Sequence, residues 1–389
     1  MTHIGVPEIT VGDGEVTWSV PVSGFPESPD RLWFTLPAQY GDMVTPRADP
    51  ALIGLLVPAM HAGGPLTIDG PVTDELAHFH RHEVQHIFHR VIGGLSRIPI
   101  ETPHTVRAGL PAEGVATGFS GGVDCFAVLA EHHFADVAPD LKITHLTHFN
   151  LGSHGAGERG REMFRVRLAR LAPVAAEMGL PLIPVDSNMD EFYGFWTHEQ
   201  THTPRTLAGA SLLQGGIGRF YLGSGSTHAR VGVFPSPHIS FADAVLVPTV
   251  VTGQFRPILH GGEYLRVEKT VLITTLPITR TSLDVCVNPP ATGGNCSRCF
   301  KCLRTELTLE IAGCLEDYAG VFDLDVYRQK RSVYLFETAV SDQPYATENR
   351  DFARRTGFRL PRVPRLLMGP GRWALKSIRA VRAALGIRR

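Results

Sequence analysis

The first part of the chain alternates short apolar runs with longer segments of helical periodicity. Proline, glycine and aspartate separate these segments, as is typical of the turns between strands and helices. The pattern predicts strands at 17–24, 31–37 and 66–70 and helices at 49–62 and 74–95, the second helix ending near Gly93 and Gly94. We therefore expect an N-terminal α+β module over residues 1–110.

From Gly114 the pattern changes to a regular alternation of one strand and one helix. Apolar runs predict strands at 114–120, 142–151, 181–188 and 220–226, and helical patterns are found at 124–133, 158–179 and 206–219. Such alternation indicates a Rossmann-like α/β fold in which helices cover a parallel sheet. Ligands of parallel sheets bind at the carboxyl ends of the strands, so the loops at Ser120, Asn150, Asp186 and Ser224 should converge.

The last third of the chain predicts an amphipathic helix at 303–318. Its apolar residues Leu303, Leu307 and Ile311 recur four apart, and Gly320 stands where a helix would end. We expect the α/β domain to span 111–320 and a C-terminal extension to span 321–389, with a short basic helix at 372–385.

Charge and composition add two points to this outline. The chain has 389 residues, 43% of them hydrophobic, and a net charge of −1, which argues against a whole molecule built to bind nucleic acid. Yet eleven Arg or Lys and no Asp or Glu lie between Arg354 and Arg389. This basic tail predicts a partner such as RNA or an acidic membrane surface, the alternative being a solvated appendage.

One strand-to-helix loop has the composition of a phosphate-binding loop. It contains Ser120, Gly121, Gly122, Val123, Asp124 and Cys125, between the strand predicted at 114–120 and the helix predicted at 124–133. Glycines let the backbone approach a phosphate closely, and backbone N–H groups at a helix start favour an anion. Asp124 would repel a phosphate directly, so we expect it to hold Mg²⁺ or to orient the loop.

This loop resembles the Ser-Gly-Gly-x-Asp-Ser pattern of the N-type ATP pyrophosphatase (PP-loop) superfamily. Cys125 stands where that pattern has serine. The resemblance implies ATP as substrate, Mg²⁺ as cofactor, and cleavage of ATP between its α and β phosphates.

Four of the six cysteines are clustered. Cys286, Cys296, Cys299 and Cys302 have the short spacings of a structural zinc site, and Arg298, Lys301 and Arg304 would offset its negative charge. An iron–sulfur cluster and free thiols are the alternatives. Clustered thiols in a chain that begins without a secretory signal predict a cytoplasmic location.

The loop and the cysteines together resemble the 7-cyano-7-deazaguanine synthase family over residues 114–312. That resemblance implies adenylation of a small-molecule or nucleobase substrate, release of pyrophosphate, and attack by an amine or ammonia to form a C–N bond. It makes Asp124, Arg266 and Lys269 the candidate catalytic residues, the basic pair lying ahead of the cysteines. Other basic candidates are Arg205, Arg219 and Arg256, and a homo-oligomer is a further expectation.

Three other functions fit parts of the sequence. Attack by a sulfur donor would make the chain a thiolating sulfur transferase, with tRNA as one candidate substrate. Loss of turnover would leave a nucleotide-binding protein without catalysis. His82, Glu83 and His86 also match the H-E-x-x-H pattern of zinc metallopeptidases, although that pattern lacks an obvious third ligand.

Overall fold

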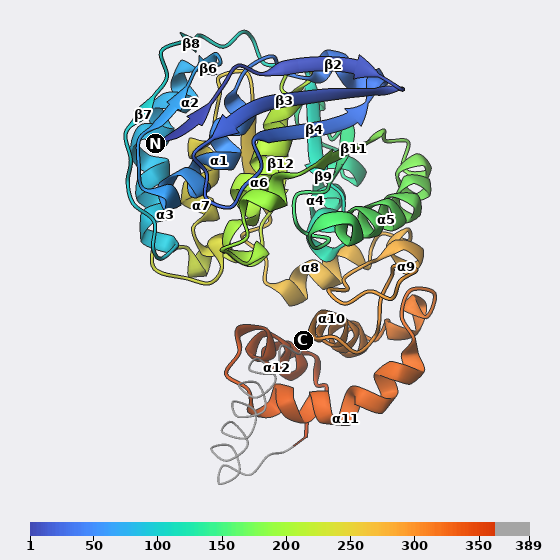
Figure 1. The fold of residues 1–389 in the computed structure, drawn as a ribbon. Helices are drawn as coiled ribbons and strands as arrows, with labels where there is room; N and C mark the ends of the chain where they lie inside the picture. The colour runs from blue at the N-terminus through green and yellow to red at the C-terminus, as the bar shows by residue number, and fades with distance from the viewer. Residues whose placement is uncertain (362–389) are drawn as a thin grey trace. The chain divides into compact units, whose positions relative to one another are not determined.

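The computed structural model describes residues 1–361, which form two compact units (Figure 1). Unit 1 consists of Met1–Ser120 and Glu131–Glu263, and unit 2 consists of Gly121–Ala130 and the chain from Tyr264 onward. The basic helix predicted at 372–385, and most of the tail expected to bind RNA or lipid, lie outside the described residues. The domain boundaries expected at residues 110 and 320 stay a prediction.

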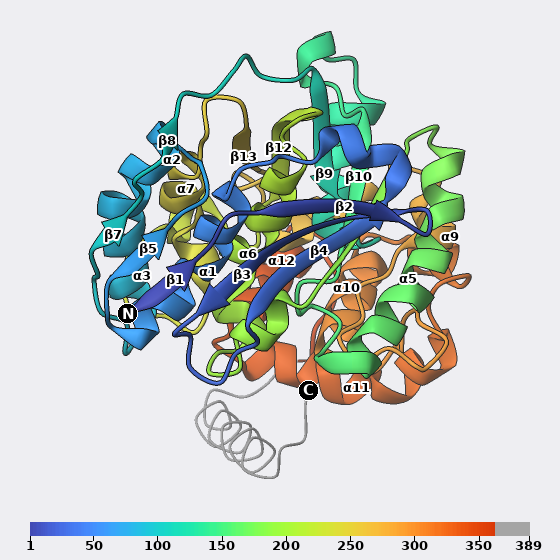
Figure 2. The same cartoon turned by 45° about the horizontal axis from the view of Figure 1, so that its top comes forward.

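Unit 1 is built on one mixed sheet of eleven strands, mostly parallel, which confirms an α/β fold. Its order is β13-β12-β9-β10-β11-β4-β3-β1-β5-β7, with β2 paired to β3, and a separate pair joins β6 and β8. Figure 2 shows β2, β3 and β4 side by side. The strands are β1 Thr2–Ile4, β2 Glu8–Gly12, β3 Glu15–Ser23, β4 Arg31–Pro37, β5 Leu66–Ile68, β6 Val72–Thr73, β7 Ile100–Glu101, β8 Thr105–Val106, β9 Gly114–Gly118, β10 His145–Phe149, β11 Leu182–Ser187, β12 Ile217–Gly223 and β13 Arg256–His260.

The sheet has a parallel and an antiparallel part. Strands β13, β12, β9, β10 and β11 run parallel, whereas β11, β4, β3 and β1 pair antiparallel. In β3 the alternate residues Val16, Trp18, Val20 and Val22 are buried, as expected for a strand with one face in the core. Helix α1 (Asp49–Ala62) packs against α6 (His198–Leu212) beside this sheet.

The other helices of unit 1 are α2 (Asp74–Phe79), α3 (Gln85–Val91), α5 (Gly157–Glu177) and α7 (Asp243–Leu246). A π-helical turn, His80–Val84, joins α2 to α3, so the helix predicted at 74–95 is continuous but irregular and ends at Val91. Unit 2 contains α4 (Val123–Leu129), α8 (Arg266–Ile273), α9 (Thr279–Ser282), α10 (Phe300–Ile311), α11 (Leu324–Val340) and α12 (Pro344–Thr356).

The helix predicted at 206–219 is displaced in the structure. Helix α6 begins at His198, where Thr197 and Gln200 form a capping box, and it ends at Leu212. Gly215 and Gly216 follow, and the residues from Ile217 enter strand β12. The glycine pair, rather than the apolar periodicity, determines where this helix ends.

The helix predicted at 303–318 is also shorter in the structure. Helix α10 ends at Ile311 because Gly313 adopts a left-handed conformation with φ of 76°, and Gly320 ends no helix. Helices α11 and α12 were not predicted. They bury Leu335 and Ala353 against Leu307 and Ile311 of α10, which gives unit 2 a small core of its own.

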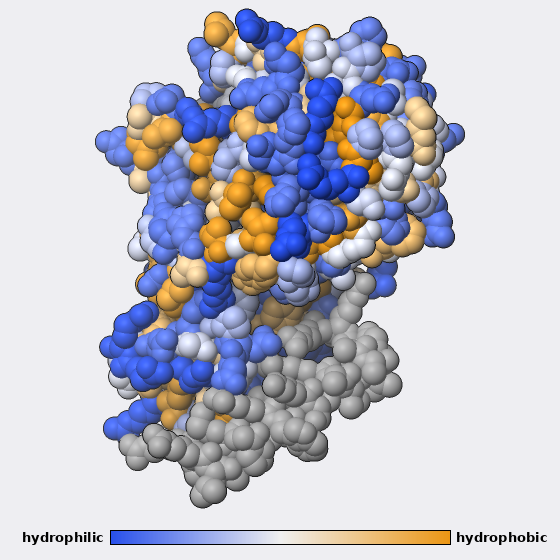
Figure 3. Space-filling model, turned by 90° about the vertical axis from the view of Figure 1, so that its left-hand side faces the viewer, coloured by the Kyte–Doolittle hydropathy of each residue, from blue (hydrophilic) through white to orange (hydrophobic). Residues whose placement is uncertain are grey.

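Within the described residues, no helix combines the length and the apolar character that crossing a bilayer would require. On the face of the molecule shown in Figure 3, hydrophobic side chains form patches that hydrophilic side chains interrupt.

A buried carboxylate connects three segments of unit 1. The side chain of Asp49 in α1 accepts hydrogen bonds from the Thr73 N–H (2.8 Å), the Thr73 hydroxyl (2.6 Å) and the Gln214 amide (3.0 Å). Burial raises the pKa of Asp49, and the hydrogen bonds from Thr73 and Gln214 oppose this rise. Gln214 in turn accepts a hydrogen bond from the Thr252 hydroxyl at 2.7 Å. One network therefore connects the start of α1 to strand β6 and to the turn after α6.

We expect Asp49→Ala to lower the free energy of unfolding by about 2–4 kcal/mol, because it leaves buried donors of Thr73 and Gln214 unpaired. Chemical denaturation measures this change. Asp136→Ala is the control, since Asp136 is exposed and should change stability by less than about 0.5 kcal/mol. Equal stabilities of the two variants would contradict the role given to the network.

Candidate metal centre and phosphate-binding cluster

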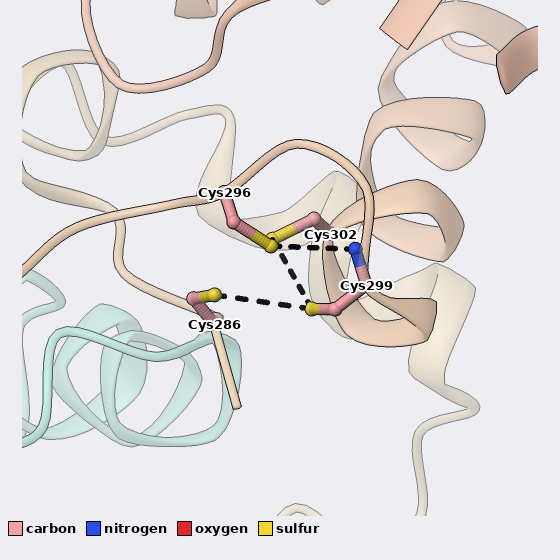
Figure 4. Close-up of side chains that lie close together, drawn as sticks. All are labelled: Cys286, Cys296, Cys299 and Cys302. Carbon is pink, nitrogen blue, oxygen red and sulfur yellow. Dashed lines mark hydrogen bonds between the residues drawn. The ribbon is translucent and has the colours of Figure 1, made fainter. Parts of the chain in front are cut away.

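Four cysteine sulfurs of unit 2 lie together (Figure 4). The Sγ–Sγ distances are 3.9 Å from Cys286 to Cys299, 4.0 Å from Cys296 to Cys302, and 3.5 Å from Cys299 to Cys302. Four thiolates at about 2.3 Å around one tetrahedral zinc ion would be about 3.8 Å apart. The predicted ligands are therefore brought together, and they could hold a metal such as zinc.

The spacing favours a single ion over a cluster of several irons. In an iron–sulfur cluster the thiolates bind different irons, which holds the sulfurs farther apart than ligands of one ion. Sulfur–sulfur hydrogen bonds with Cys286 and Cys302 lower the pKa of Cys299. The backbone N–H of Cys299 also donates to Cys296 Sγ at 3.3 Å, a contact that stabilises a thiolate.

Tight turns bring the cysteines into place. Gly293 and Gly294 have φ values of 77° and 83°, which confirms that glycines allow the chain to turn back here. Asn295 donates to the carbonyls of Leu283 (2.7 Å) and Val321 (3.1 Å). Cys299 caps the N-terminus of α10, whose first turn contains Cys302, so two of the four sulfurs depend on this helix.

The loop after β9 has the predicted strand–loop–helix context. Gly121 adopts a φ of 73°, a conformation that favours glycine, and its carbonyl accepts a hydrogen bond from the Asp284 N–H at 2.7 Å. Gly122 caps α4, and its carbonyl accepts a hydrogen bond from the thiol of Cys125 at 3.0 Å. Cys125 therefore stabilises the turn and is buried rather than presented to solvent.

The first backbone amides of this loop have no acceptor within the described chain. Among residues 1–361, the backbone N–H groups of Gly121, Gly122 and Val123 donate to no protein acceptor. Ser120 precedes them and is exposed. Successive free amides of this kind form an anion-binding concavity.

Asp124 is held by both predicted basic residues. Its Oδ2 lies 2.7 Å from Arg266 Nη2 and its Oδ1 lies 3.1 Å from Lys269 Nζ. Burial alone would raise the pKa of Asp124, but the charges of Arg266 and Lys269 outweigh burial and lower it to about 2. Because both carboxylate oxygens are engaged, this geometry favours the loop-orienting role over direct binding of Mg²⁺.

A third cation lies near this pair. Arg304 of α10 is 7% exposed, and its guanidinium lies 4.1 Å from the ring centroid of Tyr345. Burial lowers its pKa, and the charge of Arg266 lowers it further. Its Nε finds no acceptor among the described residues. We call Arg266, Lys269 and Arg304 the basic cluster.

The sequence predicts that Arg304 offsets the negative charge of the four cysteines. In the structure it contacts Tyr345 of α12, a helix that the sequence did not predict, so its place in the basic cluster could not be foreseen. Other basic candidates lie in unit 1. Arg205 stacks on Tyr193 at 3.9 Å and Arg219 pairs with Asp140.

Polar residues lie at the carboxyl ends of the parallel strands of unit 1, as the topology predicts. The Asn150 amide donates to Asp186 at 2.6 Å, which joins the loops after β10 and β11. Ser224 follows β12, the other neighbour of β9, and its N–H donates to the His260 carbonyl at 2.8 Å.

His82, Glu83 and His86 do not form a metal site in the described chain. His82 and Glu83 lie in the π-helical turn His80–Val84, and all three side chains are exposed. Among residues 1–361, no third ligand joins His82 and His86 in a group that could hold a metal ion. The peptidase function therefore gains no support from the geometry.

The chain matches no protein-family model, no curated protein and no solved structure. The resemblance to the PP-loop superfamily stays a prediction based on Ser120–Cys125 and the four cysteines.

Cys299→Ser should abolish metal binding at the cysteine cluster. Cys299 Sγ lies 3.9 Å from Cys286 Sγ and 3.5 Å from Cys302 Sγ, and a closed four-thiolate site depends on every ligand. With Co²⁺ as the probe, the absorption band of thiolate-to-metal charge transfer should disappear. Cys314→Ser is the matched control because Cys314 lies outside the cluster, and it should keep the band. A band of full intensity in Cys299→Ser would contradict the four-ligand site.

Asp124→Asn should lower the free energy of unfolding at pH 7 by about 2–4 kcal/mol, because it leaves the charges of Arg266 and Lys269 without their carboxylate. A lowered pKa means that the ionised form stabilises the fold above about pH 4, and this contribution is lost as the pH falls towards 2. The difference between wild type and variant should therefore shrink in acid. Denaturant titrations at several pH values measure it.

The control is Asp325→Asn, which breaks an ion pair with Arg328 that is largely exposed. This variant should lose less than about 1 kcal/mol. A loss in Asp124→Asn that does not depend on pH would contradict the ionised state assigned to Asp124.

Proposed function

We propose that unit 2 binds the polyphosphate of ATP and that the chain is an AMP-forming, ATP-dependent ligase. In this reaction a small-molecule or nucleobase substrate is adenylated, pyrophosphate leaves, and an amine or ammonia then forms a C–N bond.

The observation that carries the proposal is an excess of buried positive charge. The basic cluster contributes three cations, and the carboxylates that contact it are Asp124 and Glu348, the latter accepting a hydrogen bond from the Arg266 N–H at 2.9 Å. Arg304 forms no ion pair with a carboxylate among the described residues, although the more distant charge of Asp124 acts on it. Buried charge without compensation is costly, so the cluster favours an anion of high charge density.

The neighbouring loop adds donors of the right kind. The free amides of Gly121, Gly122 and Val123 belong to the same unit as the basic cluster. Backbone amides bind phosphate oxygens without adding charge, whereas arginine adds charge and a planar pair of donors. Together these groups suit two linked phosphates better than a single carboxylate.

Each residue then has a distinct role in the reaction. Arg266, Lys269 and Arg304 would stabilise the negative charge that develops on the departing pyrophosphate. Asp124 would hold Arg266 and Lys269 in place. Mg²⁺ would neutralise phosphate oxygens and is held mainly by them, since the oxygens of Asp124 are engaged. The cysteine-bound metal is structural, because four protein ligands leave no open position.

Binding of inorganic pyrophosphate with Mg²⁺ tests the proposal in the full chain. Arg304→Gln should weaken binding by at least about tenfold, because it removes the cation that has no carboxylate partner. Arg298→Gln is the matched control, since Arg298 is exposed near the cysteines, and its affinity should stay within about twofold. Calorimetric titration measures both, and equal affinities would contradict the assignment.

The nucleotide product distinguishes the possible functions. AMP and pyrophosphate, formed in the presence of candidate substrates, would support adenylation, whereas ADP and phosphate would refute it. A thiolated product would identify the chain as a sulfur transferase. Tight binding of ATP without any product would indicate a nucleotide-binding protein that does not catalyse a reaction.

A further inference from the structure

A second group of metal-binding side chains lies in unit 1. It consists of Glu131, His260 and Glu263, and one ligand atom from each lies within 4.8 Å of the other two. His260 ends strand β13, Glu263 follows three residues later, and Glu131 begins the segment of unit 1 that Glu263 ends. All three are distinct from the cysteine cluster and from the basic cluster.

The contact between His260 and Glu131 is short but poorly aligned for a hydrogen bond. His260 Nε2 lies 2.6 Å from Glu131 Oε2. Nevertheless Nε2 is buried and forms no hydrogen bond of acceptable geometry with a described residue. A proton on Nε2 would lie in the ring plane and would not point at this oxygen.

His132 orients the His260 ring. Nε2 of His132 lies 3.1 Å from Nδ1 of His260, and the His132 ring stacks on Tyr221 with centroids 4.0 Å apart. In this geometry Nε2 of His132 is placed to accept the Nδ1 proton of His260.

This tautomer leaves a lone pair on Nε2 of His260. A lone pair at 2.6 Å from a carboxylate oxygen is repulsive unless a cation lies between them. Metal-bound histidines usually donate their other ring N–H to a neighbouring acceptor, and His132 provides that acceptor here. The ring orientation, the short contact and the nearby Glu263 all fit one bound cation.

We propose that Glu131, His260 and Glu263 bind a divalent first-row transition ion. One imidazole and two carboxylates are a typical donor set for Zn²⁺ or Mn²⁺, and they are harder ligands than the four thiolates of unit 2. Three protein ligands leave an open position for water or an anion. The side chains of Glu131 and His260 are 28% and 15% exposed, and Glu263 is exposed, so the ion exchanges with solvent.

Titration of the full-length, metal-free chain with Co²⁺ tests this proposal. The wild type should bind two equivalents. One should produce the thiolate charge-transfer band of the cysteine cluster, and the other should bind without adding to that band. His260→Ala and Glu263→Gln should lose only the second equivalent, with a loss of affinity of at least about tenfold.

Two variants serve as controls. His3→Ala removes a histidine that lies 2.8 Å from Asp69 and has no third ligand among residues 1–361. His82→Ala removes the first histidine of the H-E-x-x-H pattern. Both should keep two equivalents. Because Glu263 is exposed, Glu263→Gln should fold even if His260→Ala does not.

A single equivalent in the wild type would overturn the proposal. So would a second equivalent that persists in Glu263→Gln, or one that is lost in His82→Ala.

Discussion

Asp124 lies between Arg266 and Lys269, and this ion pair is the contact on which the candidate site of unit 2 depends. Lys269 and Arg266 are mostly buried, so each needs a negative partner close by. Asp124 pairs with both cations, and Glu348 accepts a hydrogen bond from the backbone N–H of Arg266. Arg304 adds a third positive charge, and under the proposed function this group of cations would favour an anionic ligand. The geometry of the loop and the proposed ligand thus follow from one electrostatic constraint.

The two proposed metal sites bring negative groups together, where the basic cluster brings positive groups together. Four sulfurs within 4.8 Å of one another, and two carboxylates beside an imidazole, bring together groups that repel each other once ionised. A cation relieves that repulsion in each case. The chemistry of the donors then separates the sites, because thiolates favour a closed structural centre and carboxylates an exchangeable one.

The sequence predicts those features that are encoded by neighbouring residues. The loop Ser120–Cys125 and the four cysteines are compact motifs, and the alternation of strands and helices from Gly114 predicts the parallel part of the sheet. Features that depend on contacts between residues far apart in the sequence could not be predicted. Arg304 meets Tyr345 only because α12 packs on α10, and Glu131 meets His260 only because β13 joins the edge of the sheet. The ends of α6 and α10 were misplaced because capping residues and glycines override apolar periodicity.

Helix α10 contains both the last cysteine of the cluster and Arg304, separated by a single residue. Release of the metal would loosen the first turn of this helix, and Arg304 belongs to that same stretch of backbone. Oxidation of the thiols to a disulfide would have a similar effect, because a disulfide brings two sulfurs closer than a shared ion does. The arrangement would therefore make the proposed phosphate binding sensitive to oxidation of the cysteines.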